Sequence, residues 1–372
     1  MTYTVASLFS GAGFLDFGFS ETGFDVVWGI ELVAQFASAN NDNHQRRYNH
    51  NQIIIQNGDI TEVNPQDIPR TTGIIGGPPC QDFSIGNANS PGVDGDRGKL
   101  VWDFLRKINF LKPKFFLFEN VESLYKTRKH RTEALEPLLE QFKELGYEVY
   151  FRVLNTLDFG IPQDRSRVFI VGFKKEIIDT LKDNEIQEFK WPDPIYTIPK
   201  SVYEWPSTID FGTEINEEEY IRNIDYPYEL TVHSVIGNEE ELSSLPNHIS
   251  FRPYSARFHN VPEGDVKRKS FKRLHRFRFS PTVAYGNNEV HLHPTLPRRL
   301  TVREALRLQS VPDWYSFEKE TPLGKMFKMV SNGVAYKLSE LLAIQIKEVL
   351  DNYSNIQDTQ INKANKATLT VK

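Results

Sequence analysis

The only cysteine in the sequence, Cys80, lies in a turn whose composition favours chemistry over packing. The surrounding residues, GGPPCQDFS (Gly76–Ser84), place two glycines and two prolines directly before the thiol, at the end of an apolar run. A lone cysteine is most often buried as a small apolar side chain. A rigid Pro-Pro-Cys turn at a strand end is not a packing position, however, and a helix end that follows it would favour the thiolate. Cys80 is therefore a candidate nucleophile.

Acidic and basic side chains stand beside two later apolar runs. Glu119 and Asn120 close the run FFLFENV, and Arg165 and Arg167 belong to QDRSR, which precedes VFIVGF. A carboxyl beside a thiol at the mouth of a sheet can protonate or hydrogen-bond a substrate nitrogen, and partial burial would raise its pKa for that role. On its own, Glu119 could equally be a helix cap. The arginines could bind a carbonyl oxygen or a phosphate, or simply pair with the neighbouring Asp164.

A glycine-rich turn near the N-terminus has the composition of a nucleoside-binding site. In SLFSGAGFLDFGF, an apolar run leads into Gly11 and Gly13, where the missing side chains let a ligand approach the backbone. Glu31 ends the next apolar run, well placed for two ribose hydroxyls, and Asp59 follows the third, where it could accept a hydrogen bond from an adenine amine. A nicotinamide-binding turn would have a third glycine at the position of Asp16. The pattern favours a nucleoside cofactor and weakens the case for a nicotinamide dinucleotide.

Apolar runs alternate with helical patterns between Tyr3 and Phe173, and they would position these side chains. The runs are nearly continuous, as expected for strands that are covered on both faces. Strands that alternate with helices predict a doubly wound, mostly parallel α/β sheet, with ligands at the carboxyl ends of the strands. The expected strands are Val5–Phe9, Val26–Glu31, Ile53–Gln56, Gly73–Gly76, Phe115–Glu119, Val149–Asn155 and Val168–Phe173, and the expected helices are Phe14–Ser20, Leu32–Asn41, Leu100–Phe110 and Thr132–Leu145.

The sequence changes character after the last of these strands. Prolines recur in irregular, acidic and aromatic sequence, which predicts a second, smaller and less regular domain. Helical patterning returns at Ala335–Leu350 and at 301–309, which opens with the capping-box spacing of Thr301 and Glu304. The polar residues 351–372 show no periodicity and are expected to form a frayed or disordered tail. The predicted division is a first domain at 1–178 completed by 322–350, an irregular domain and hinge at 179–321, and the tail.

Charge is unevenly distributed along the chain, although the formal net charge of −5 alone argues against a nucleic-acid binder. Arg252–Gln309 holds 13 lysines and arginines against 4 acids, whereas Asp183–Ser250 holds 15 acids against 3 bases. A basic segment of this kind is typical of a surface that binds phosphates, although a solvated surface segment has the same composition. The densest stretch, KRKSFKRLHRFR, supplies the candidate contacts Lys267, Arg268, Lys269, Lys272, Arg273, Arg276 and Arg278.

Composition excludes several classes of protein. With 372 residues the chain is too long for one small core, and 39% hydrophobic and 25% charged residues are ordinary globular values. A single cysteine excludes a disulfide framework and any multi-cysteine zinc site, and we expect no metal. The N-terminus lacks a basic leader segment, and no stretch approaches about 18 consecutive apolar residues. We therefore expect a cytoplasmic protein that does not span a membrane.

Six blocks, in sequence order, resemble those of the cytosine carbon-5 DNA methyltransferases, and most of all the bacterial modification enzymes: SLFSGAGFLDFGF, GGPPCQDFS, FENV, QDRSRVFIVG, RRLTVREALRLQSVPD and MVSNGV. The combination of Pro-Pro-Cys-Gln, Glu-Asn-Val and Gln-x-Arg-x-Arg is highly specific, and the blocks span residues 7 to about 350. Three positions depart from the family pattern. Phe14 interrupts a glycine pair, Leu32 replaces an aromatic residue, and Ser331 stands where glycine is common. The resemblance implies a Rossmann-like methyltransferase fold with a target-recognition domain.

The resemblance also implies covalent catalysis on cytosine. Carbon 5 of cytosine is a poor nucleophile, and a thiolate that adds to carbon 6 gives the ring the electron density needed to accept a methyl group. The resemblance assigns that thiolate to Cys80, and it assigns Glu119 to the ring nitrogen and exocyclic amine. Arg165 and Arg167 follow the family pattern, with Arg167 as the expected contact to the ring carbonyl. Asn120 would orient the neighbouring backbone.

Duplex DNA is the substrate that the resemblance implies, and S-adenosylmethionine is the implied methyl donor. The target base must leave the duplex to reach the thiol. The irregular domain would read base edges, while the basic segment and Ser84 would contact the DNA. We expect a monomer that works beside a cognate restriction endonuclease. By correspondence with the family, the residues that contact the donor include Phe9, Gly11, Gly13, Glu31, Asp59, Ile60, Pro79, Leu100, Asn332 and Val334.

Three other functions are weighed against this one. A tRNA cytosine-5 methyltransferase would share the catalytic blocks, but the Cys-Phe-Thr signature of that branch of the family is absent. A nucleic-acid-binding regulator with an inactive site is disfavoured because every proposed catalytic residue is present. A nicotinamide oxidoreductase is disfavoured by Asp16.

Overall fold

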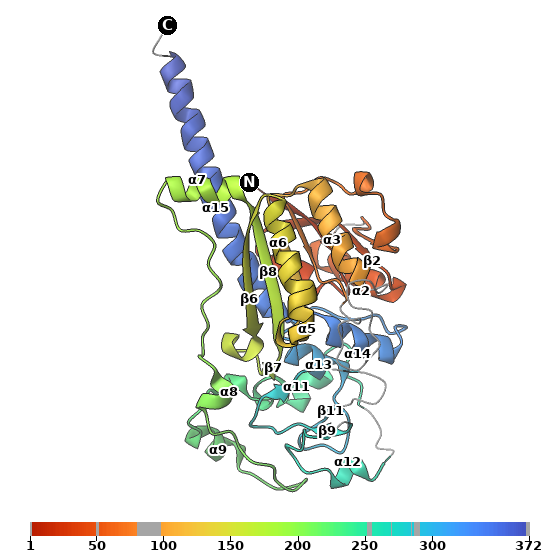
Figure 1. The fold of residues 1–372 in the computed structure, drawn as a ribbon. Helices are drawn as coiled ribbons and strands as arrows, with labels where there is room; N and C mark the ends of the chain where they lie inside the picture. Colours follow the sequence, from red (N-terminus) through yellow and green to blue (C-terminus); the bar gives the residue numbers. More distant parts are fainter. Residues whose placement is uncertain are drawn as a thin grey trace.

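The computed structural model describes residues 2–49, 52–79, 98–250, 255–268, 270–283, 285 and 291–369. These residues form a lobe built on a β-sheet and, below it in Figure 1, a second lobe of short elements. A long C-terminal helix runs along the first lobe and projects beyond it (Figure 1).

A seven-stranded sheet forms the centre of the first lobe. Its strands are β1 Tyr3–Leu8, β2 Phe24–Glu31, β3 Ile55–Asn57, β4 Gly73–Gly76, β5 Phe115–Val121, β6 Tyr147–Asn155 and β8 Ser166–Lys174. The strand order is β3-β2-β1-β4-β5-β8-β6. Only β8 runs against its neighbours, β5 and β6, and the other pairs are parallel. The predicted doubly wound, mostly parallel sheet is confirmed.

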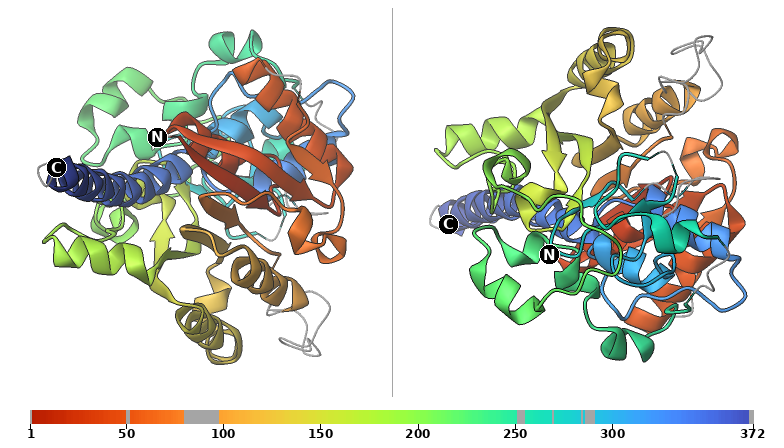
Figure 2. Two further views of the ribbon diagram at one scale, coloured as in Figure 1. Left: turned by 90° about the horizontal axis from the view of Figure 1, so that it is seen from above. Right: turned by 90° about the horizontal axis from the view of Figure 1, so that it is seen from below.

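Helices cover both faces of this sheet (Figure 2), which is why its strands are apolar on both sides. One face packs on α1, α7 and α15 around Phe19, Phe115 and Ile346, and the other packs on α3 and α6 around Phe104 and Phe116. The longer helices are α1 Phe14–Glu21, α2 Ala34–Tyr48, α3 Gly98–Leu111, α6 Glu136–Glu144, α7 Lys175–Asp183 and α15 Tyr336–Leu369.

Short helical turns connect these elements. The helix expected at Thr132–Leu145 begins as a π-helical turn, Arg131–Leu135, and becomes α-helical at Glu136. The remaining turns of the first lobe are the helices α4 Ser123–Lys126 and α5 Arg128–His130 and the 3-10 turns Ile60–Glu62, Pro65–Asp67 and Thr156–Phe159.

The second lobe has little regular structure among its described residues. Two-residue strands pair in two small ribbons, β10 with β7 and β11 with β9, and the β7–β10 pair joins the second lobe to the segment before β8. The short elements are β7 Gln163–Asp164, α8 Pro199–Val202, α9 Glu217–Asn223, the 3-10 turn Tyr228–Leu230, α10 His233–Ile236, α11 Glu239–Ser243, α12 Arg257–Asn260, β9 Lys272–Arg273, β10 Ser280–Pro281 and β11 His291–Leu292.

Two helices return the chain from the second lobe to the first. They are α13 (Val302–Leu308) and α14 (Leu323–Asn332). The capping box predicted for the first of them is confirmed, since Thr301 Oγ1 accepts from the Glu304 backbone and the Glu304 carboxylate accepts from the Thr301 backbone. These helices pack with α2 in a shared apolar cluster, so the last part of the chain completes the first lobe.

The end of the chain differs from the sequence prediction. Residues 351–369 continue α15 as one helix, so the prediction of a frayed tail is wrong as far as Leu369. The extension is held by tertiary contacts, because the Tyr3 hydroxyl donates to Asp351 at 2.9 Å and lies 3.2 Å from the Ser354 hydroxyl. Ile356 is buried against the first lobe. None of the described helices is long and apolar enough to cross a membrane.

Candidate active site

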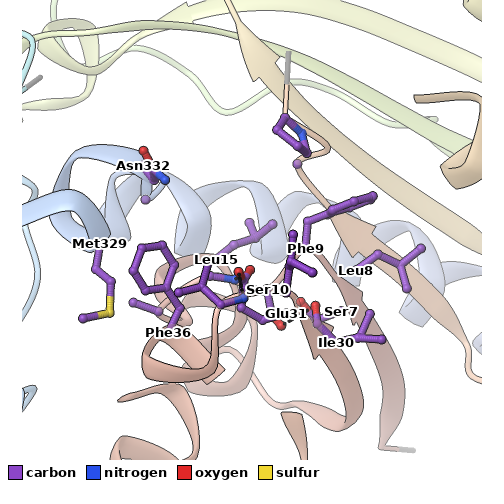
Figure 3. Close-up of a pocket in the computed structure, with 18 of the residues that line it drawn as sticks. Ser7, Leu8, Phe9, Ser10, Leu15, Ile30, Glu31, Phe36, Met329 and Asn332 are labelled. Carbon is purple, nitrogen blue, oxygen red and sulfur yellow. Dashed lines mark hydrogen bonds between the residues drawn. The ribbon is translucent and has the colours of Figure 1, made fainter. Parts of the chain in front are cut away.

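A cavity of about 480 Å³ opens at the carboxyl ends of β1, β2, β4 and β5, with α14 as its far wall (Figure 3). This is the edge where a doubly wound sheet binds its ligands. The structure brings together nine of the ten residues that the resemblance assigned to the methyl donor; Gly13 is the exception. The nine that line the cavity are Phe9, Gly11, Glu31, Asp59, Ile60, Pro79, Leu100, Asn332 and Val334.

The turn between β1 and α1 owes its shape to its glycines. Gly11 and Gly13 have φ angles of 56° and 86°, in the left-handed region that favours glycine. A Cβ at Gly13 would lie 2.5 Å from the side-chain oxygen of Asn40, so a larger residue would push α2 away. Gly13 therefore lets the turn pack closely against Asn40 of α2, whereas Gly11 lines the cavity.

Glu31 joins this turn to the end of β2. One of its carboxylate oxygens accepts from the Gly11 backbone and the other from the Val33 backbone, each at 2.9 Å. Burial raises the pKa of Glu31, and those two backbone hydrogen bonds oppose the shift. The carboxylate is thereby fixed in one orientation at the cavity wall, and its remaining lone pairs suit the two hydroxyls of a ribose.

Asp59 stands at the next strand end, after β3. Its Oδ1 accepts from the Thr61 backbone at 2.9 Å and from the Thr61 hydroxyl at 2.8 Å, which caps the 3-10 turn at Ile60–Glu62. Both Asp59 and Ile60 line the cavity. A fixed acceptor beside an apolar side chain is a suitable environment for an adenine, which presents an amine and a flat apolar ring.

Asp16 has a structural role beneath the cavity. It is fully buried and accepts hydrogen bonds from Ser7 Oγ at 2.6 Å and from Asn40 Nδ2 at 2.8 Å, so it ties β1, α1 and α2 together. Burial raises the pKa of Asp16 to about 6, and the two hydrogen bonds lower it in part. Asp16 stands where a nicotinamide-binding turn would have a glycine. In this protein it connects the three elements that form the floor of the cavity.

Glu119 reaches the same cavity from β5. Its side chain is nearly buried, and its Oε1 lies 3.1 Å from Arg167 Nε. Burial raises the pKa of the Glu119 carboxyl, while the charges of Arg167 and Arg165 lower it. A Cβ at Gly77 would lie 2.7 Å from Glu119 Oε2, so the glycine lets the turn after β4 lie against this carboxyl.

The two arginines of QDRSR have different surroundings. Arg167 forms the ion pair with Glu119, whereas Arg165 is fully buried and donates to the backbone oxygens of Ser331 at 2.9 Å and Gly333 at 2.8 Å. A further contact joins Arg165 to the Val283 carbonyl at 3.4 Å. In this arrangement Arg165 holds the end of α14 and the second lobe in place, and Arg167 faces the carboxyl proposed for catalysis.

Asn120 fixes the turn that leads to the thiol. Its Nδ2 donates to the Pro78 carbonyl at 3.0 Å, and its Oδ1 accepts from the Val121 backbone at 2.8 Å. Cys80 and Ser84 lie outside the described residues. The last described residue before the thiol, Pro79, lines the same cavity as Glu119.

The basic stretch of the second lobe divides into surface and interior residues. Lys267 and Arg268 are exposed, although Arg268 pairs with Asp265 at 2.5 Å, while Lys272 and Arg278 are half-buried. Lys269 lies outside the described residues. The remaining two basic side chains of the stretch, Arg273 and Arg276, are buried.

Buried Arg273 and Arg276 organise the fold of the second lobe. The Arg273 guanidinium donates to backbone carbonyls, including that of Val261 at 2.8 Å and that of Leu296 at 3.1 Å. Arg276 pairs with the buried Glu263 at 2.9 Å. This corrects the expectation that both residues contact DNA, because their donors already meet partners inside the protein.

Glu239, His293 and Glu304 gather potential metal-ligating atoms within 4.8 Å of one another in the second lobe. Arg298 occupies the centre of this group, since its NH2 lies 2.8 Å from a Glu239 oxygen and 2.7 Å from a Glu304 oxygen. His293 Nδ1 accepts from backbone N–H groups, which places the proton of a neutral imidazole on Nε2. The group is therefore an ion-pair network around the Arg298 guanidinium, buried at Glu304 and His293 and exposed at Glu239.

Sequence reasoning missed several residues that line the cavity. Phe36 of α2 and Lys325, Lys328 and Met329 of α14 all belong to its wall. The three α14 residues precede Asn332 by seven, four and three positions, which places them on one helical face with it. This spacing from Asn332 is the sequence feature that could have predicted the three residues as part of the cavity wall.

The sequence profile of the family described as C-5 cytosine-specific DNA methylase matches residues 3–348. This chain belongs to the C-5 cytosine-specific DNA methylase family. It is similar to the type II methyltransferase M.NmeDI of Neisseria meningitidis serogroup C, with 38% identity over 94% of this chain and 84% of the relative. The type II methyltransferase M.FnuDI of Fusobacterium nucleatum is 31% identical over 94% of this chain and 96% of its own length.

Solved structures share the fold at lower identity. The Dnmt2 methyltransferase of S. pombe has a TM-score of 0.62 and 15% identity, covering 94% of this chain and 99% of that one. The methyltransferase EhMeth of Entamoeba histolytica has a TM-score of 0.60 and 14% identity, again covering 94% and 99%. These likenesses support the Rossmann-like methyltransferase fold.

Proposed function

We propose that this DNA cytosine-5 methyltransferase transfers a methyl group from S-adenosylmethionine to a cytosine that has left the duplex. We also propose that it is the modification enzyme of a type II restriction-modification system, as its relatives' names suggest. The observation that carries the proposal is the shared cavity. It combines Glu119, the turn that leads to Cys80, and the acidic strand ends Glu31 and Asp59.

The residues of the cavity fit the proposed donor. Glu31 offers acceptors for ribose hydroxyls, and Asp59 offers one for an adenine amine, while Phe9, Ile60 and Leu100 supply apolar contact. The volume of about 480 Å³ is in the range of sites for ligands of this size. When bound there, S-adenosylmethionine would supply an electrophilic methyl group.

The protein's own groups would prepare the base for that methyl group. The Cys80 thiolate would add to carbon 6, so that carbon 5 gains electron density. Glu119, whose pKa burial raises, would donate a proton to the ring nitrogen as the thiolate attacks. Arg167 would hold the carboxyl and contact the ring carbonyl, while Asn120 would hold the Cys80 turn against β5.

For the DNA surface we propose the basic residues that remain accessible. Lys267, Arg268, Lys272 and Arg278 would contact phosphates, which position the duplex, whereas other groups of the second lobe would read base edges. Residues 1–178 with 322–350 would form the catalytic domain, and 179–321 the target-recognition domain and hinge.

A methyl-transfer assay tests the proposal. Purified full-length protein is incubated with tritiated S-adenosylmethionine and mixed-sequence duplex DNA, and the nucleosides are separated after digestion. The proposal expects label in 5-methylcytosine from DNA and its loss in Cys80→Ser with DNA binding retained. Label in tRNA but not in DNA would favour the tRNA enzyme instead, and methylation by Cys80→Ser would contradict covalent catalysis.

A further inference from the structure

One face of α14 forms a wall of the proposed donor pocket. Lys325, Lys328, Met329 and Asn332 line the cavity, and offsets of three, four and seven residues from the first place all of them on one side of a helix. Figure 3 shows Met329 and Asn332 on one side of the pocket and Phe9 on the other. Lys328 therefore stands one helical turn from Asn332, and Lys325 stands two turns from it.

The helix that carries these lysines is firmly anchored. Met326 and Val330 are buried on its other side, and Gln309 Nε2 donates to the Val330 carbonyl at 2.9 Å. Arg165 holds the carbonyls on either side of Asn332, as described above. Because the backbone of α14 is fixed at its end, the lysine side chains project from a wall of defined position.

Charge is divided between the two walls of the pocket. Four carboxylates, those of Asp16, Glu31, Asp59 and Glu119, come from the sheet and the elements beside it. Among the described residues that line the pocket, the cationic side chains are those of α14, Lys325 and Lys328. Both lysines are exposed, and neither pairs with a carboxylate in the part of the chain that the structure describes.

The chemistry of the proposed donor matches this division. Its nucleoside end suits Glu31 and Asp59, and its sulfonium and ammonium groups suit a wall of carboxylates. Its own carboxylate would be repelled by that wall and needs a cation or a strong hydrogen-bond donor opposite it. A lysine ammonium has three N–H donors on a flexible stem and remains hydrated until a ligand arrives.

We propose that Lys328, supported by Lys325, binds the carboxylate of the methyl donor and so sets the position of the donor along the strand ends. This rests on the proposed use of S-adenosylmethionine. The two lysines are positioning residues, since they touch the amino-acid end of the donor and not the methyl group or the base. Contact with a DNA phosphate is the competing role, and the lining of the pocket by both side chains favours the donor.

Calorimetric titration of the full-length protein, without DNA, tests this role. The two ligands are S-adenosylmethionine and its decarboxylated form, which differ in the carboxylate alone. Lys328→Met should weaken S-adenosylmethionine binding about tenfold, as expected when one charge-assisted contact is lost. Lys325→Met should have a smaller effect, and Lys328→Arg should restore most of the affinity. The decarboxylated ligand should bind wild type and Lys328→Met within about twofold of each other.

A matched control removes the same charge elsewhere. Lys319 is also exposed but does not line the pocket, so Lys319→Met should leave both affinities unchanged. The proposal would be overturned if Lys328→Met lowered the affinity for both ligands equally, or lowered the affinity for neither. A loss of duplex affinity with donor affinity intact would also overturn it, and would assign the lysine to a phosphate. If wild type binds neither ligand, the proposed donor itself is wrong and this role falls with it.

Discussion

The two lobes of this protein depend on charged residues to different degrees for their fold. In the first lobe apolar strands and helices supply the fold, and charged side chains such as Glu31 and Glu119 stand at strand ends around a cavity. In the second lobe regular structure is short, and buried ion pairs such as Arg276–Glu263 and Arg298–Glu304 hold the irregular segments together.

This difference shows that charge density alone does not locate a binding surface. A buried arginine whose five donors meet carbonyls or carboxylates is part of the core, and its removal leaves several polar groups without partners. An exposed lysine a few residues away can be replaced with little cost to folding. Both kinds occur within Lys267–Arg278, where sequence shows only a run of basic residues.

The largest expected effect concerns the first lobe. Glu119→Gln keeps the shape of the side chain but cannot transfer a proton, so kcat for methylation should fall by about 10² to 10⁴. Donor affinity, measured by calorimetry, should fall far less than kcat does, because three other carboxylates still line the pocket. Because burial raises the pKa of Glu119, wild-type kcat should decline as pH rises through that pKa. Glu122→Gln, one residue beyond β5, is the matched control, and an equal loss of rate in both variants would contradict the role of Glu119.

A pair of substitutions in the basic stretch separates folding from DNA contact. Arg273→Met should lower the free energy of unfolding by about 3 kcal/mol or more, because buried carbonyls lose their donor. Lys267→Met removes the same charge from the surface, so Tm should stay unchanged. The slope of log Kd for duplex DNA against log salt should fall by about one in that variant. If Arg273→Met has the same free energy of unfolding as the wild type, buried arginines do not stabilise the second lobe, and the proposed difference between the lobes is wrong.

A smaller, pH-dependent effect is expected at the floor of the cavity. Burial raises the pKa of Asp16 from its ordinary value of 3.8 to about 6 in the folded protein. Its contribution to stability is therefore fully present below pH 3.8 and is lost as pH rises through 6, by roughly 3 kcal/mol at 1.36 kcal/mol per pKa unit. In chemical denaturation from pH 4 to 7, Asp16→Asn should lack this loss.

The exposed Asp25→Asn on β2 is the control for that series. Its stability profile should follow that of the wild type at every pH. If Asp16→Asn also follows the wild type, the carboxyl is not held in the buried, hydrogen-bonded state that the structure shows.

Much of the first lobe could be predicted from sequence because its physical signals are local. The strand at Gly73–Gly76 was predicted to the residue, since a continuous apolar run between polar segments leaves few alternatives. The Thr301–Glu304 capping box was predicted for the same reason, because both partners lie within one turn. The clustering of Glu31 and Asp59 followed from strand order in a parallel sheet.

What sequence reasoning missed depends on partners far along the chain. The helical continuation of α15 relies on Tyr3, which lies 348 residues from Asp351. The burial of Arg273 relies on carbonyls at Val261 and Leu296, which no residue pattern encodes. A run of basic residues predicts a DNA-binding surface only when their side chains are not already hydrogen-bonded to groups inside the fold.

The central claim is that a thiolate at Cys80 attacks a cytosine held beside Glu119. The most direct measurement uses duplex DNA with 5-fluorocytosine at every cytosine, because the fluorine cannot leave as a proton does and the adduct persists. Wild type with this duplex and S-adenosylmethionine should give a denaturation-resistant complex whose peptide mass places the base and its methyl group on Cys80. Two results would contradict this mechanism. One is that no such complex forms, although the protein methylates the same duplex when it contains ordinary cytosine. The other is that the base is attached to a residue other than Cys80.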